Sequence, residues 1–206
     1  MGAISWRSIV RTGLLAAAGS VYVALVGLYT KFADLALVGE QITLGRVLLV
    51  APALVAAYAA TRPRIVAGER RPVPFGNGMS VGAITGLVGG AVFAVAIAFA
   101  DWFGVDRIRE VFVAVTEPLI DFLTFEKGVP AGLPILVGLC VAGGVIGGFA
   151  RTAPAVVRKP VSVGVLAVVL LGLLQRIVPI VFVELGFEAD WLYRPASGLT
   201  FLGATV

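Results

Sequence analysis

The fold is decided by the stretch Met79-Ser-Val-Gly-Ala-Ile-Thr-Gly-Leu-Val-Gly-Gly-Ala-Val-Phe-Ala-Val-Ala-Ile-Ala-Phe99. No charged side chain occurs anywhere between Arg71 and Asp101. In helical form, about 20 consecutive apolar residues cross the hydrocarbon core of a bilayer, which is about 30 Å thick. The stretch therefore predicts a membrane-spanning helix.

Similar apolar runs recur along the chain. The other expected spans are Thr12 to Thr30, Ile42 to Ala60, Pro130 to Ala150 and Val161 to Val183, and the tail Ser197 to Val206 looks like the start of a sixth. Of the 206 residues, 59% are hydrophobic and 14% are charged, against about 25% charged in a soluble protein. The sequence predicts an all-α fold, a single polytopic transmembrane helix bundle with five full spans.

The first run also has features of a signal peptide, because Arg7 and Arg11 come before it. It is longer than the usual apolar region of about 7–15 residues, and no clear A-x-A cleavage site follows it. We therefore expect it to remain as the first span.

The basic residues indicate the orientation, because loops on the cytoplasmic side of a membrane are enriched in Lys and Arg. An arrangement with the N-terminus inside places Arg7 and Arg11 in the cytoplasm, together with a basic face made of Arg62, Arg64, Arg70, Arg71, Arg151, Arg158 and Lys159. Most acidic residues then lie outside. We expect a multi-pass protein of the inner membrane. The basic face either sets this topology or also contacts a partner or anionic lipid.

The segment between the third and fourth spans has its own pattern. From Val105 to Phe125, apolar residues recur every three or four positions, with charged residues on the other side. This pattern predicts an amphipathic helix at the outer interface, broken into two short helices at Pro118. It is either a lid or docking surface, or a connecting helix packed on the ends of the bundle.

Small residues form stripes in the third and fourth spans. The expected helix-packing positions are Gly82, Gly86, Gly90, Gly143 and Gly147. Such stripes allow helix backbones to approach closely in lipid; the alternative is that they line a pore.

One charge lies well inside a predicted span, at Gln175-Arg176. A central arginine costs about 2.5–3.5 kcal/mol on the insertion scale and therefore needs a partner. Asp101 and Glu184 are the candidates. These four residues form either a functional polar site or a structural ion pair.

The sequence argues against catalysis and against bound cofactors. There is no histidine, and Cys140 is the one cysteine, so the common zinc, haem and triad chemistries lack their residues. No span pairs a nucleophile with a base or carries a buried carboxylate pair. We expect a protein that is not an enzyme, with no metal, cofactor or nucleic acid.

Several short sequence segments resemble branched-chain amino acid ABC transporter permeases of the type found in filamentous green bacteria. They are Arg11-Thr-Gly-Leu-Leu-Ala-Ala, Val21-Tyr-Val-Ala-Leu-Val-Gly, Ile42-Thr-Leu-Gly-Arg-Val-Leu-Leu, Phe122-Leu-Thr-Phe, Val169-Leu-Leu-Gly-Leu-Leu-Gln and Ser197-Gly-Leu-Thr-Phe-Leu-Gly-Ala. The resemblance implies the N-terminal membrane region of such a permease. It also implies leucine-, isoleucine- or valine-like substrates, cytoplasmic ATPase subunits and an external solute-binding protein.

The chain departs from these permeases because it lacks a recognisable segment for coupling to the ATPase. The alternative is a non-catalytic accessory subunit that packs against other membrane subunits of a respiratory or photosynthetic complex.

Overall fold

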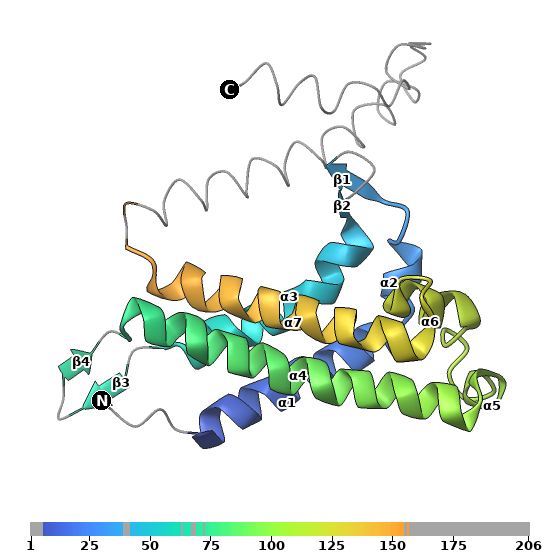
Figure 1. Cartoon of the computed structure of the whole chain (residues 1–206), viewed down its shortest axis with the longest axis horizontal. Coiled ribbons are helices and arrows are strands. Elements are labelled where there is room, and N and C mark those ends of the chain that lie inside the picture. Colours follow the sequence, from blue (N-terminus) through green and yellow to red (C-terminus); the bar gives the residue numbers. More distant parts are fainter. Residues whose placement is uncertain are drawn as a thin grey trace, which may run out of the picture.

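The computed structural model describes residues 6–38, 42–62, 64–66, 69–71, 73–154 and 156. In this part of the chain, a bundle is formed by α1 (Trp6–Leu25), α3 (Leu44–Ala60), α4 (Phe75–Phe103) and α7 (Gly128–Thr152). The connections contain the short helices α2 (Leu28–Lys31), α5 (Val105–Arg109) and α6 (Glu117–Thr124) and two small antiparallel ribbons. Figure 1 shows this arrangement.

Three of the described helices, α1, α4 and α7, are long and apolar enough to cross a membrane. The fourth bundle helix, α3, is also apolar but has only 17 residues. The prediction of a helical, membrane-embedded protein is therefore confirmed. The expected span at 161–183 and the tail at 197–206 lie outside the described residues, so the count of five spans stays a prediction.

The first two spans differ from their predicted bounds. Helix α1 begins at Trp6 and ends at Leu25 because Gly27 has a φ of 75°, a left-handed conformation that glycine adopts at little cost. The chain then continues as α2. Ile42 and Thr43 form strand β2, which pairs with β1 (Ala36–Val38), so α3 begins two residues later than predicted.

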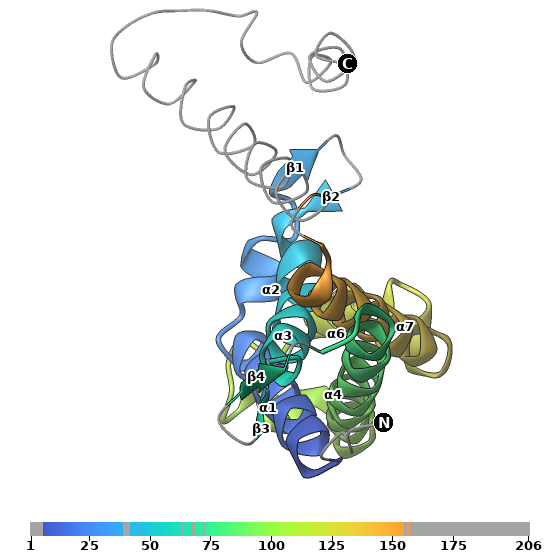
Figure 2. The same cartoon turned by 90° about the vertical axis from the view of Figure 1, so that its left-hand side faces the viewer.

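The four bundle helices form a closed set of neighbours. Viewed along the bundle in Figure 2, α1 lies beside α3 and α4, and α7 lies beside the same two helices. The most extensive interface joins α4 and α7, which lie side by side and run in opposite directions (Figure 1). Helices α4 and α7 therefore form the most closely associated helix pair of the bundle.

The two halves of the α4–α7 interface are packed differently. In the first half of α4 the buried residues are mostly glycines, whereas Phe93 and Ile97 are buried in the second half. In α7 the order is reversed, with Leu136 buried early and four glycines buried late. Small residues let the helix backbones approach closely, and larger side chains keep them apart. The main apolar cluster accordingly lies in the half built from larger residues, around Tyr29, Leu49, Phe93 and Leu119.

Charges are separated along the bundle. The basic end is where α1 begins, α3 ends, α4 begins and α7 ends; it carries Arg7, Arg11, Arg62, Arg151 and the ribbon of β3 (Arg64–Val66) and β4 (Glu69–Arg71). The opposite, acidic end includes α2, α5 and α6 and carries Asp34, Asp101, Asp106, Glu110, Glu117, Asp121 and Glu126, with a smaller number of basic residues.

Candidate functional site: an apolar pocket at the acidic end

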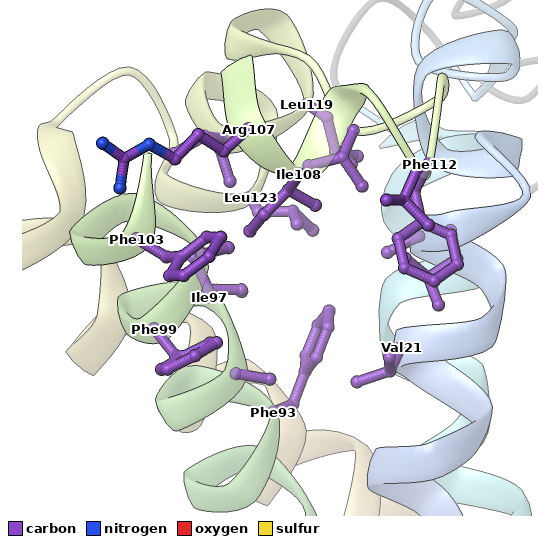
Figure 3. A pocket seen from close by; sticks show the side chains of 17 residues that line it. Val21, Phe93, Ile97, Phe99, Phe103, Arg107, Ile108, Phe112, Leu119 and Leu123 are labelled. Atoms are coloured by element: carbon purple, nitrogen blue, oxygen red, sulfur yellow. The ribbon is translucent and has the colours of Figure 1, made fainter. Parts of the chain in front are cut away.

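A pocket of about 410 Å³ lies at the acidic end between α1, α4 and the α5–α6 segment. Figure 3 shows its lining side chains pointing toward one another from these elements. Several of its lining side chains are buried in the protein, among them Phe93 and Ile97 of α4 and Leu119 and Leu123 of the α5–α6 segment. The pocket lies where the larger residues of α4 replace its glycines, so it occupies the half of the bundle in which the helices are less closely packed.

The rim of the pocket is exposed and mostly aromatic. Phe99, Phe103 and Phe112 line it and retain much of their accessible surface. Arg107 is the one charged residue among the described residues that line the pocket. Its Cζ lies 5.9 Å from the centre of the Phe103 ring, within the range of a cation–π contact. In Figure 3 its guanidinium is directed away from the hollow, so the interior remains apolar.

The roof of the pocket corrects the prediction of one interfacial helix over 105–125. Gly104, with a φ of 97°, ends α4, and α5 extends only to Arg109. The next helix, α6, begins at Glu117 with Pro118 in its first turn, the position at which proline suits a helix. The expected division into two short helices at Pro118 is confirmed, but the seven residues between them are not helical.

Helix α6 packs onto the bundle through its apolar face. Leu119, Ile120, Leu123 and Thr124 are buried, whereas Glu117 and Asp121 are exposed. Its main neighbour is α7, where Gly132 allows close contact: a Cβ there would collide with Thr124. The amphipathic pattern thus serves to seat α6 on the ends of the bundle helices.

The predicted packing glycines face two different helices. Gly82, Gly86 and Gly90 of α4 face α7, where a Cβ on the first two would collide with the carbonyl oxygens of Gly144 and Cys140. Gly143 and Gly147 of α7 instead face α3, where they meet the side chain of Val50 and the carbonyl oxygen of Leu54, respectively. The paired glycines of α7 therefore let two neighbours approach the same helix.

The structure locates only one member of the predicted polar site. Asp101 lies exposed in the last turn of α4. Gln175, Arg176 and Glu184 lie outside the described residues, so the expected pairing stays a prediction.

The described part of the predicted basic face is gathered at one end of the bundle. Arg62 is exposed, and Arg64, Arg70 and Arg71 belong to the β3–β4 ribbon. Arg151 donates a hydrogen bond of 2.8 Å to the hydroxyl of Tyr58 and lies 4.8 Å from its ring centre. Arg158 and Lys159 lie outside the described residues.

The pocket itself was not predicted from the sequence. Its rim residues Phe99, Phe103 and Phe112 look in the sequence like ordinary members of apolar runs. The available signal was the change along α4 from glycines to Phe93 and Ile97, which indicates that the helix has different neighbours in its two halves. No group of three or more metal-ligating side chains occurs among the described residues. The site can hold hydrocarbon and offers its interior no group for acid–base chemistry.

Comparison of the chain with protein-family models, with curated proteins and with solved structures finds no match.

Proposed function

We propose that this chain is a non-catalytic subunit of a larger membrane complex, with five spans and its N-terminus in the cytoplasm. The observation that carries this proposal is the composition of the interior. Among the residues whose side chains the structure describes, no charged side chain is buried. The hydroxyls of Thr61, Thr85 and Thr124 are buried and bond to the carbonyl four residues earlier at 2.8–3.0 Å. These features favour a bundle that packs over one that conducts a polar solute.

The physical reason is the cost of desolvation. A zwitterionic amino acid carries an ammonium and a carboxylate, and burying either without a partner is strongly unfavourable. The close glycine contacts between α4 and α7 likewise fill the space through which a solute would pass. Both features suit a subunit whose lipid-facing and partner-facing surfaces carry its function.

The role is tested by purifying the tagged full chain from its own membrane in a mild detergent. We expect redox or pigment-binding subunits of a respiratory or photosynthetic complex at fixed stoichiometry. Recovery of ATPase subunits in their place would contradict the proposal and support a permease.

The orientation and the span count are tested by cysteine labelling. In a Cys140→Ala background, Ser8→Cys, Asp106→Cys and Asp190→Cys are each treated with a membrane-impermeant maleimide in right-side-out vesicles. We expect labelling at positions 106 and 190, and labelling at position 8 only after permeabilisation. Inside labelling at position 190 would contradict five spans.

The second candidate is a component of an importer for branched-chain amino acids. It is supported by three of the permease-like segments, which begin at Arg11, Val21 and Ile42 and fall largely on α1 and α3, two helices that pack against each other. Uptake of labelled leucine by cells with and without the gene tests this role. Loss of uptake on deletion, restored by the wild-type chain, would favour the importer.

A further inference from the structure

We propose that the pocket at the acidic end binds one acyl chain of a phospholipid, with the phosphate of the headgroup at Arg107. This inference goes beyond the proposed role and depends only on the chain being embedded in a membrane. It assigns a ligand to a cavity whose lining combines an apolar interior with a cationic edge.

The residues that line the pocket favour a hydrocarbon ligand. Apart from Arg107 at the edge, every lining residue is aliphatic or aromatic, so the interior of the pocket offers no partner for a polar ligand. The volume of about 410 Å³ lies within the usual range for small-molecule sites of about 300–1,000 Å³. An apolar space left empty forfeits the dispersion contacts of its walls, and the most abundant apolar groups around a membrane protein are lipid acyl chains.

The depth of the pocket matches one leaflet. On α4 its lining extends from Phe93 to Phe103, which is about 15 Å along a helix, or about half of a hydrocarbon core of about 30 Å. Trp102, in the last turn of α4, is 80% exposed, and tryptophan is enriched at the level of the headgroups. The pocket therefore extends from that level toward the bilayer centre, as an acyl chain does.

The edge of the pocket suits a phosphate. Arg107 contacts the ring of Phe103, while Figure 3 shows its guanidinium pointing away from the hollow. A guanidinium presents donors in a fork that matches phosphate oxygens. The flanking Asp106 and Glu110 keep this surface from being strongly basic, so we expect a single phosphodiester group to bind and not a cluster of anions.

Two matched pairs of variants test the proposal. Ala100→Phe places a ring in the pocket, which Ala100 lines, whereas Ala91→Phe adds the same ring at an exposed position of the same helix. Arg107→Gln removes the proposed phosphate ligand, whereas Arg109→Gln removes the charge of a residue on α5 that does not line the pocket. Ala100→Leu is the milder alternative if Ala100→Phe does not fold.

The measurement is native mass spectrometry of the full chain in dodecyl maltoside, titrated with palmitoyl-oleoyl phosphatidylglycerol. We expect one lipid bound to the wild type and to both controls, with affinity about tenfold lower for Ala100→Phe and several-fold lower for Arg107→Gln. Equal binding by Ala100→Phe and Ala91→Phe, or no retained lipid on the wild type, would overturn the proposal. So would a second copy, or a partner subunit, in place of the lipid.

The outcome is independent of the test of the proposed function. Lipid retention is measured on the isolated chain, whereas the subunit role is measured by the identity of the copurifying proteins. Failure of one therefore leaves the other standing.

Discussion

Gly82 of α4 and Gly144 of α7 face each other so closely that neither position has room for a side chain. A Cβ on Gly82 would collide with the carbonyl oxygen of Gly144, and a Cβ on Gly144 would collide with the carbonyl oxygen of Gly82. A Cβ on Gly86 would likewise collide with the carbonyl oxygen of Cys140. The two backbones are thus in direct contact, which gives them the dispersion and weak Cα–H···O contacts that hold helices together in lipid.

The first prediction follows from this contact. Gly82→Ala is expected to destabilise the bundle by about 1–3 kcal/mol, the usual cost of overpacking, because the neighbour is backbone and cannot rotate away. Gly138→Ala is the matched control, since a Cβ on Gly138 meets nothing within 4 Å, and we expect it to be neutral or slightly stabilising. Unfolding midpoints in one detergent measure both; equal midpoints would contradict the packing argument.

A second prediction concerns the packing of α6 against α7. Gly132→Ala is expected to push α6 away from α7, because the new methyl group would collide with the backbone of Thr124. Amide hydrogen exchange should then increase over Glu117–Thr124 and change little at the α4–α7 contact. Unchanged exchange in α6, measured beside Gly138→Ala, would show that α6 does not depend on this contact.

How much of the fold followed from the sequence depends on the kind of feature. The spanning helix that contains Met79 could be predicted, because length and hydropathy are properties of a single segment of the sequence. Gly82, Gly86 and Gly90 were recognised as a small face for the same reason. Gly143 of α7 faces α3, whereas the adjacent Gly144 faces α4. This division was not predicted, because a stripe of small residues does not show which helix it packs against.

The pocket and the Tyr58–Arg151 contact were missed for a related reason. Each depends on the relative placement of separate elements: three segments meet at Phe93, and two helix ends meet at Arg151. The break at Gly27 was missed because the apolar run continues through it, so that hydropathy carries no sign of the left-handed residue.

The third prediction tests the contact that joins the ends of α3 and α7. Tyr58→Phe removes the acceptor of the 2.8 Å hydrogen bond from Arg151 and keeps the ring beneath the guanidinium. We expect a loss of about 0.5–1.5 kcal/mol, and for Tyr58→Leu a further loss of about 0.5–1 kcal/mol as the cation–π contact disappears. Tyr22→Phe, at an exposed position on α1, is the control. Identical stability of Tyr58→Phe and Tyr58→Leu would argue against a contribution from the ring.

The last prediction concerns Tyr29, whose side chain is completely buried. Its ring lies 6.3 Å from that of Phe122 and 6.4 Å from that of Phe93, so the ring is well packed. Ser20 lies beside its hydroxyl, but that hydroxyl has no hydrogen-bond partner with acceptable geometry among the described residues. A buried, unpaired polar group destabilises a fold by about 1–3 kcal/mol.

Tyr29→Phe retains the ring and removes the unpaired hydroxyl. We therefore expect the variant to be at least as stable as the wild type, with the gain limited to about 1 kcal/mol where the hydroxyl retains weak interactions. The unfolding midpoint in detergent measures this, with Tyr58→Phe as the opposite case of a tyrosine whose hydroxyl is bonded. A clear loss of stability in Tyr29→Phe, matched by an equal loss in Ser20→Ala, would mean that the two hydroxyls bond to each other in the membrane.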